Sequence, residues 1–346
     1  MKVAFVAPNY SWENRGNGVT VRRIERNLRA MGCDIAVFPT EEFGAEMLLQ
    51  SVSEFAPDCI HAFHAWHGGR AALSLSARLG VPFVVTITGT DVYGERDDRG
   101  RAELGRVLAA ASGVAVFHES VRGQLLLAAP ELASRITIIP QGVTVPLEPP
   151  PETAGEFVFL LPAGIRPVKN VTFPIIPLSR IHDEQPMTRL KIVGPMLDRD
   201  YGTMVTDALA PFSWASYGGE RTFAQMASEY AAAHVVLNTS VAEGGMANSL
   251  LEAMAFGRPV LAADIDGNRS LICDGVNGLL YRDETDFALK AGRLMAEPAL
   301  RQRLGLAARR FVRENCSPTD EAEKYLELYC RAARPGMSEY RQTCTK

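Results

Sequence analysis

Two glutamates, Glu243 and Glu252, stand on either side of a glycine-bearing segment that can hold a negatively charged ligand. A strand, VVLNTS, is predicted before them, and a helix is predicted to begin near Ala247 or Asn248 and to be capped by Asn248 or Ser249. The first amides of a helix lack partners within it, so they can bind an anion such as a diphosphate. Glu252 can accept hydrogen bonds from vicinal ribose hydroxyls, and Glu243 from a bound sugar. The residues that we expect between them at the ligand are Gly244, Gly245, Met246, Ala247, Asn248 and Ser249.

Two cations, Arg166 and Lys169, stand in the segment GIRPVKN directly after a predicted strand at Phe157–Leu161. Open α/β sheets bind their ligands at the carboxyl ends of the strands. A guanidinium and an ammonium there suit a diphosphate leaving group, whose charge grows as the bond to it breaks. Two solvated loop charges are the alternative. We identify no Asp-x-Asp pair at a predicted strand end and no His/Cys cluster with the spacing of metal ligands. We therefore expect these cations to act without a metal ion.

Three histidines, His61, His64 and His67, stand in the segment HAFHAWHGGR at and after a predicted strand, Cys59–Ala62. Because histidine titrates near neutral pH, His64 can serve as a base for an acceptor or can hydrogen-bond a bound sugar. His118, which follows another predicted strand, is the second candidate. Ordinary packing and loop hydrogen bonds remain the alternative for each of these histidines.

A glycine-rich loop, Gly16-Asn17-Gly18, follows the first predicted strand and permits close approach of a phosphate group or an acceptor. It is not a complete dinucleotide-binding fingerprint, which disfavours an oxidoreductase. The helix predicted after it carries Arg22, Arg26 and Arg29 at near-helical spacing. This basic face is predicted either to be solvated or to give weak membrane association.

Short apolar runs alternate with helical patterns along the whole chain, which predicts parallel βαβ units. The predicted strands are Val3–Ala7, Ile35–Phe38, Cys59–Ala62, Phe83–Thr88, Val114–Phe117, Ile136–Ile139, Phe157–Leu161, Leu190–Val193, Val235–Asn238 and Pro259–Ala262. A proline-rich segment at 146–152 interrupts the pattern and is predicted to be a semi-rigid hinge. We therefore expect an N-terminal domain at 1–150, a C-terminal domain at 151–320, a helix and tail at 321–346 packing back on the first domain, and an active-site cleft between the domains.

Composition narrows the classes of protein. The 346 residues carry a net charge of −4 and are 47% hydrophobic, which suits two globular domains and gives no general basic field for nucleic acid. The start, MKVAFVAPNY, predicts a strand rather than a signal peptide, and no apolar stretch approaches the roughly 20 residues of a membrane span. The six cysteines are scattered along the chain, so we expect them to be reduced thiols and the protein to be cytoplasmic.

The segment from Glu243 to Tyr281, EGGMANSLLEAMAFGRPVLAADIDGNRSLICDGVNGLLY, resembles the C-terminal signature of the family 4 glycosyltransferases. GIRPVKN and LKIVGP strengthen this resemblance, and VVTITGTDVYG fits the family's N-terminal half. The resemblance implies the GT-B fold, in which two Rossmann-like domains with mainly parallel sheets face each other across a cleft. Within the family, the chain is most similar to small glycosyltransferase-one-domain-containing proteins and selenosugar synthases, which also carry GTD and a counterpart of His64.

The resemblance also implies roles for individual residues, with two departures. Arg166, Lys169, Glu243 and His64 are expected to be catalytic. Thr88, Asp91 and His118 are expected to line the acceptor. Many retaining members carry a histidine where this chain has Thr88, so neither retention nor inversion is predicted. The two glutamates are separated by one residue more than is usual in the family, which leaves the role of Glu243 less defined than that of Glu252.

Together these features predict a glycosyltransferase of the hexosyltransferase class. It is expected to transfer a sugar from a nucleotide-diphosphate sugar, preferably a UDP-sugar, to a small-molecule or glycan acceptor without a cofactor or metal. Three alternatives remain open: a GT-B nucleotide-sugar epimerase, a selenosugar or thiosugar synthase, and a non-catalytic nucleotide-sugar-binding protein.

Overall fold

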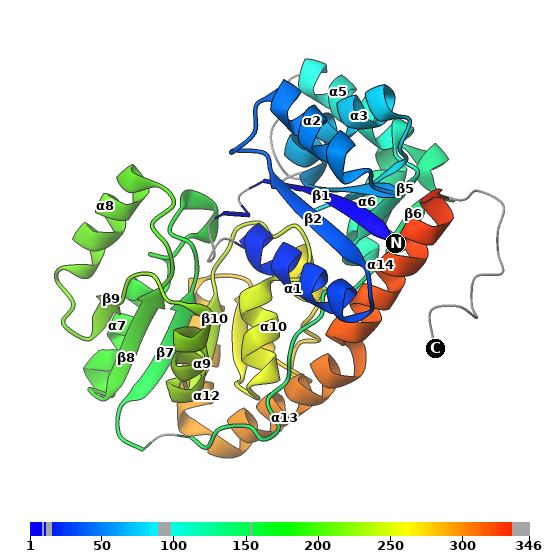
Figure 1. Ribbon diagram of the computed structural model, residues 1–346. Coiled ribbons are helices and arrows are strands. Elements are labelled where there is room, and N and C mark those ends of the chain that lie inside the picture. Colours follow the sequence, from blue (N-terminus) through cyan, green and yellow to red (C-terminus); the bar gives the residue numbers. More distant parts are fainter. Residues whose placement is uncertain (9, 12–15, 89–97, 153, 334–346) are drawn as a thin grey trace. The chain divides into compact units, whose positions relative to one another are not determined.

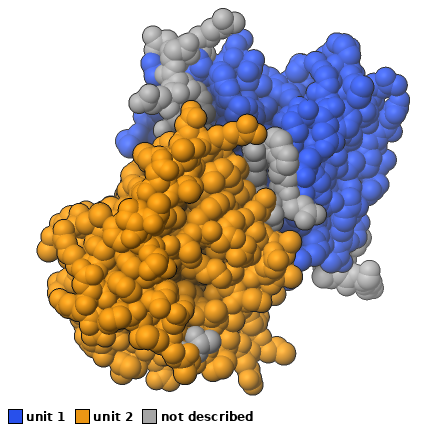
Figure 2. Space-filling model, turned by 90° about the vertical axis from the view of Figure 1, so that its left-hand side faces the viewer, with its two compact units in different colours: residues 1–142, 318–346 blue, residues 143–317 orange. Residues whose placement is uncertain are grey.

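The computed structural model of the protein describes residues 1–346 except 9, 12–15, 89–97, 153 and 334–346. It consists of two compact units (Figure 2). The first unit comprises residues 1–142 and 318–346, and the second comprises residues 143–317. Each contains a parallel six-stranded sheet with helices on its faces, which confirms the predicted α/β fold class (Figure 1).

The sheet of the first unit has the strand order β2-β1-β3-β4-β5-β6. Its strands are β1 (Lys2–Ala7), β2 (Asp34–Pro39), β3 (Cys59–Phe63), β4 (Phe83–Thr86), β5 (Gly113–Val116) and β6 (Ile136–Ile138). Its helices are α1 (Gly16–Ala30), α2 (Ala45–Phe55), α3 (Gly69–Leu79), α5 (Asp98–Ala110), α6 (Glu119–Ala128) and α14 (Pro318–Ala333). A π-helical turn, His64–Gly68, directly follows β3.

Both faces of this sheet are covered, which explains why its strands are almost continuously apolar. Alternate residues of β1 point to opposite faces. Ala4 and Val6 join the core beneath α2, α3 and α5, whereas Val3 and Phe5 join the core beneath α1 and α14. In Figure 1, α14 (red) runs beside α1 (blue) and closes this second face.

The sheet of the second unit has the strand order β12-β11-β10-β7-β8-β9. Its strands are β7 (Phe157–Pro162), β8 (Thr188–Val193), β9 (Ala215–Tyr217), β10 (Val235–Asn238), β11 (Val260–Ala263) and β12 (Leu279–Tyr281). Its helices are α7 (Ile175–Glu184), α8 (Arg199–Leu209), α9 (Phe223–Ala232), α10 (Asn248–Ala255), α11 (Asp266–Arg269), α12 (Glu284–Ala296) and α13 (Pro298–Asn315). Residues of α7, α8, α12 and α13 form one buried core against the strands.

The strands predicted from the sequence all overlap observed strands, and two strands were missed. The missed strands, β9 and β12, are the two edges of the second sheet and have three residues each. Three residues are too few to show a period of two. β6 is equally short, but it was predicted because it lies within the apolar run at 136–139.

The proline-rich segment at 146–152 belongs to the second unit and is bound to it by three arginines. Arg258 and Arg309 donate hydrogen bonds to main-chain carbonyls of the segment. Arg301 forms a bidentate ion pair with Glu152, with N–O distances of 2.6 and 2.9 Å. The predicted hinge is therefore attached to one unit along most of its length.

The chain passes between the units at 142/143 and again at 317/318. The first change of unit thus lies eight residues before the domain end expected at 150, because the bound proline segment adds its contacts to the second unit. The second change places α14 with the first unit. No helix in the part of the chain that the structure describes has the length and apolar character needed to cross a membrane.

Candidate active site

The loop that carries Arg166 and Lys169 is held at the carboxyl end of β7. Its main chain pairs with the end of β8, where the Ile165 amide donates to the Pro195 carbonyl at 2.8 Å. Gly194 makes this close approach possible, because its φ is +146° and a Cβ there would lie 2.1 Å from the carbonyl oxygen of Ala163. The two cations therefore stand at the sheet edge that was predicted for them.

Arg166 carries a buried donor, its Nε, without a hydrogen-bond partner among the described residues. A buried guanidinium N–H without an acceptor is costly, since protein interiors pair most of their polar groups. An arginine with unused donors at the ligand edge of a parallel sheet is suited to an anion.

Lys169 forms a close ion pair with Glu243, with an Nζ–Oε1 distance of 2.5 Å. Both side chains are largely buried, at 17% and 11% exposure. The loops that carry them are also joined through the main chain, since the Val241 amide donates to the Val168 carbonyl at 3.0 Å. The structure thus places these two predicted site residues together.

Two further donors reach the same oxygen of Glu243, namely Ser240 Oγ at 2.7 Å and Asn238 Nδ2 at 3.1 Å. Burial alone would raise the pKa of Glu243, but the charge of Lys169 and these hydrogen bonds outweigh it and hold the pKa below its usual value. Glu243 is therefore ionised at neutral pH. Every hydrogen bond to it from a described residue falls on Oε1, which leaves Oε2 as an unused acceptor.

The helix expected after the glycines begins at Asn248, as predicted, but its cap differs from the prediction. Ala247 occupies the N-cap position and has no side-chain hydrogen bond, so neither Asn248 nor Ser249 is the cap. Gly245 precedes the helix with φ at +129°, a conformation that favours glycine. No capping side chain therefore competes with a ligand at the start of this helix.

Glu252 lies on α10 and is held by a buried tyrosine of α9. The Tyr230 hydroxyl donates to Glu252 Oε2 at 2.7 Å. Burial raises the pKa of Tyr230 well above its ordinary value, and the Glu252 charge adds to this, so the phenol remains a donor. The Tyr230 hydroxyl thus fixes this oxygen of the carboxylate.

The three histidines of the HAFHAWHGGR segment have different surroundings. His61 is completely buried within β3, where Nε2 lies 2.7 Å from Thr86 Oγ1 and Nδ1 lies 2.6 Å from the Tyr329 hydroxyl. Burial lowers the pKa of His61 to about 3. It is a neutral packing residue that joins the sheet to α14, whereas His67 is exposed.

His64, the histidine chosen from the sequence, adopts a strained backbone conformation. Its φ is +69°, which is uncommon for a residue other than glycine, and it opens the π-helical turn after β3. Its ring is buried, and Nδ1 accepts a hydrogen bond from the His67 amide at 3.3 Å. Such strain is concentrated at functional sites, so the geometry is compatible with the predicted role.

The remaining predicted residues of the first unit are spread over several elements. His118 is the N-cap of α6, where its Nδ1 accepts from the Ser120 amide at 3.1 Å, and burial lowers its pKa. Thr88 is half-buried just after β4. Asp91, with the rest of the GTD segment, lies outside the described residues.

The glycine-rich loop and the basic face belong to α1. Gly16, Asn17 and Gly18 form the first turn of this helix rather than a loop before it. Arg22 lies over the Tyr10 ring at 4.5 Å, and Arg29 pairs with Glu25 at 3.0 Å. Two of the three arginines are thus engaged within their own unit, and membrane association stays a prediction.

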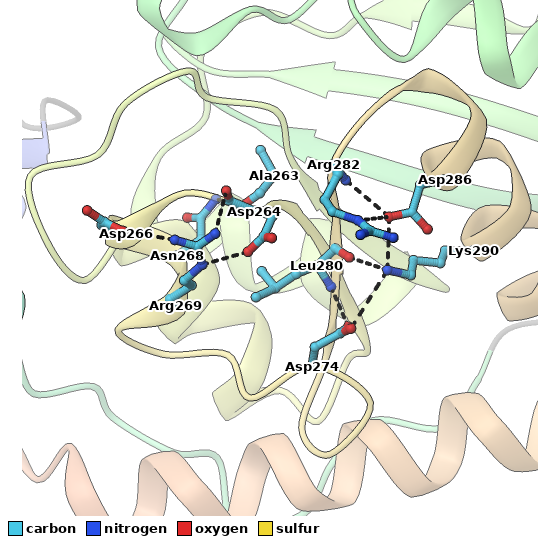
Figure 3. Close-up of polar contacts among 10 residues, drawn as sticks. All are labelled: Ala263, Asp264, Asp266, Asn268, Arg269, Asp274, Leu280, Arg282, Asp286 and Lys290. Atoms are coloured by element: carbon cyan, nitrogen blue, oxygen red, sulfur yellow. Dashed lines mark hydrogen bonds and ion pairs between the residues drawn. The ribbon is translucent and has the colours of Figure 1, made fainter.

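An Asp-x-Asp pair does follow a strand, contrary to the expectation from the sequence. Asp264 and Asp266 come directly after β11, and both pair with Arg269, at 2.7 and 3.0 Å (Figure 3). Lys290 pairs with Asp286 in the same view. Within the described residues, no group of three or more His, Cys, Asp or Glu side chains is arranged to hold a metal ion.

Sequence reasoning missed the residues that hold the two glutamates. Asn238 was detectable, because a polar residue ending an apolar strand is a recognisable signal. Tyr230 gave no signal, because it is 22 residues from Glu252 in the sequence.

Both sheets are of the Rossmann type, and the second carries cations and carboxylates at the edge where such sheets bind ligands. This arrangement is typical of GT-B proteins. The profile of Glycosyltransferase Family 4 matches residues 1–145, and that of Glycosyl transferases group 1 matches residues 156–297. The chain belongs to the family 4 GT-B glycosyltransferases.

Individual proteins are similar over most of the chain. Glycosyltransferase 1 domain-containing protein 1 of Xenopus tropicalis is 28% identical over 95% of this chain and 97% of its own length. A D-inositol 3-phosphate glycosyltransferase of Frankia alni is 27% identical over 72% of this chain and 69% of its own.

Solved structures have the same fold at low sequence identity. Anabaena HepE in complex with UDP and glucose has a TM-score of 0.78 at 18% identity, covering 94% of this chain and 98% of HepE. Sucrose-phosphate synthase of Thermosynechococcus elongatus has a TM-score of 0.81 at 19% identity, and the match covers 96% of this chain and 98% of the synthase.

Proposed function

We propose that this glycosyltransferase transfers a hexose from a UDP-sugar to a small-molecule or glycan acceptor, and that it does so without a metal ion. In this proposal, Arg166, Lys169 and the start of α10 bind the diphosphate, and Glu252 binds the ribose. Glu243 accepts a hydrogen bond from a hydroxyl of the transferred sugar.

One observation carries the proposal: cations and acceptors meet at one end of the second sheet with capacity left for a ligand. Arg166 Nε is buried without a partner among the described residues, and Glu243 uses only Oε1 for its neighbours. A diphosphate needs donors and a sugar needs an acceptor, and both are offered here. As the bond to the sugar breaks, the cations would stabilise the charge that develops on the leaving diphosphate.

The names of the similar proteins support the choice of donor. HepE was solved with UDP and glucose, and again with UDP-glucose. The acceptor is proposed to bind to the first unit, through Gly16–Gly18, His64, Thr88, Asp91 and His118, with His64 as its base. The five described cysteines are free thiols, which fits the proposed location in the cytoplasm.

The first test is a thermal-shift screen with UDP, GDP and their sugars, because a compound that binds only the native state raises its melting temperature. UDP compounds should give the largest shifts. Glu252→Ala should weaken UDP binding by roughly 100-fold, because each hydrogen bond to a charged group is worth about 1.5–3 kcal/mol. Calorimetry with UDP measures this loss.

Glu284→Ala is the matched control, since Glu284 lies on the surface of the same unit and pairs only with Arg180 among the described residues. It should bind UDP as the wild type does. Equal UDP affinity of Glu252→Ala and the wild type would contradict the proposed ribose site. Release of UDP together with an epimerised sugar in the absence of acceptor would instead indicate an epimerase.

A further inference from the structure

A buried asparagine on α11, Asn268, has an orientation that its neighbours fix. Its Nδ2 donates to the Ala263 carbonyl at 2.9 Å (Figure 3) and to Asn238 Oδ1 at 3.2 Å. Turning the amide over would set its oxygen against these two acceptors. Asn268 keeps its orientation although its own Oδ1 has no partner among the described residues, a state that costs about 1–3 kcal/mol.

Asn268 fixes the orientation of Asn238, and Asn238 in turn contacts Glu243. Asn238 Oδ1 accepts from both Asn268 Nδ2 and the Ser240 amide, which lies at 3.1 Å. With its oxygen held in this way, Asn238 must present Nδ2 to Glu243 Oε1. Asn268 therefore fixes the Asn238 amide, and the Asn238 amide binds Oε1 of Glu243, whereas no described residue donates to Oε2.

The main chain of α11 also limits where Glu243 can lie. A Cβ at Gly267 would lie 2.4 Å from Glu243 Cβ and 2.6 Å from the Glu243 carbonyl oxygen. Contacts this short are forbidden, so only glycine allows the loop of Glu243 to pack here. Asn268 acts on Glu243 through Asn238, and Gly267 acts on it by leaving room for its loop. Both neighbours on α11 therefore constrain the same residue.

We propose that α11 is a positioning element for donor selection. Asn268 and Gly267 hold Glu243 so that Oε2 faces the hexose and accepts a hydrogen bond from one of its hydroxyls. Neither residue contacts the sugar. The protein therefore distinguishes hexoses that differ in the orientation of one hydroxyl. This inference rests on the proposed function.

The test compares Asn268→Ala with Asn277→Ala. Asn277 is a matched control, because it is also buried and its side chain also makes two hydrogen bonds, here to the main chain of Leu271 and Cys273 and not to the network of Glu243. Calorimetry is carried out with UDP, UDP-glucose and UDP-galactose. The wild type should bind one of the two sugar nucleotides roughly tenfold more tightly, the value of one hydrogen bond.

In Asn268→Ala the ratio of the two affinities should fall to about twofold or less, while UDP affinity stays within about twofold. Asn277→Ala should keep the wild-type ratio. Gly267→Ala displaces Glu243 but removes no hydrogen-bonding side chain. This variant should also lose the preference between the two sugar nucleotides, and it replaces Asn268→Ala if that variant does not fold. An unchanged ratio in both α11 variants overturns the positioning role alone, whereas a wild type that does not bind UDP overturns the proposed function as well.

Discussion

Both units bury a network of polar side chains, and the two networks differ in charge and in completeness. In the first unit, His61 lies between Thr86 and Tyr329, and both ring nitrogens have a partner. In the second unit, Glu243 is charged, is paired with Lys169, and has one oxygen without a partner among the described residues. The first network is neutral and complete, and the second is ionic and incomplete.

This difference separates packing from binding. A neutral side chain with every hydrogen bond made inside the protein has nothing left for a ligand and serves to join elements, here β3 to α14. A buried carboxylate is costly unless it is compensated, so keeping one with an open acceptor is explained best by a ligand. The unused bonding capacity, rather than the residue type, marks the site.

The largest effect is expected from Lys169→Met, which breaks the ionic network. The variant loses a cation at the proposed diphosphate site and leaves Glu243 buried without its charge partner. Removal of one such group typically reduces kcat by roughly 100- to 1,000-fold. The measurement is turnover of the sugar nucleotide that most stabilises the wild-type protein.

Lys191→Met provides the comparison, because Lys191 and Glu229 form an ion pair of the same length, 2.5 Å, in the same unit. Glu229 keeps a second partner, Arg221, at 2.7 Å, and no site residue takes part. This variant should turn over the donor at nearly the wild-type rate. Equal losses in both variants would mean that Lys169 acts through stability alone.

The second prediction uses the pH dependence of the two networks. The pKa of His61 falls from an ordinary 6.5 to about 3 on folding, so between these values the unfolded chain binds a proton that the native state does not. The stability of the first unit should therefore decrease as the pH falls from 6.5 towards 3. The pKa of Glu243 is lowered from 4.5, so its contribution is lost only at more acidic pH.

At about pH 5, the His61 contribution should already have decreased by roughly 2 kcal/mol. Hydrogen exchange should then show earlier opening in β3, β4 and α14 than in β7 and β10. His61→Gln, which cannot titrate, should flatten the pH dependence of unfolding in this range. The same slope for variant and wild type would show that His61 does not titrate as its burial requires.

The sequence predicted what depends on local pattern. Apolar runs located the long strands, and the order of strand, glycine and helix located α10, which begins at Asn248. Lys169 and Glu243 were both expected at one ligand, and the structure joins them in an ion pair. Parallel strands bring their carboxyl ends to one edge, so such pairs follow from topology.

The sequence could not predict what depends on three-dimensional packing. His61 and His64 are three residues apart and of one type, yet only the fold shows that the first is enclosed by α14, which lies more than 250 positions away. The binding of the proline segment by Arg258, Arg301 and Arg309 is equally non-local. Propensity gives no information about such partners.

The smallest effect is expected from a chelator, and it tests whether the ionic network is sufficient. Positive charge and N–H groups at the proposed diphosphate site come from Lys169, from the start of α10 and from Arg166 Nε, which has no partner among the described residues. A metal ion that performed this task would contribute several kcal/mol, and its removal would be unmistakable. We therefore expect EDTA to leave the affinity for UDP-glucose and its turnover within about twofold of the untreated values. Loss of either one, restored by magnesium or manganese, would show that protein cations alone do not neutralise the diphosphate, and Lys169→Met would then be expected to cost less than predicted above.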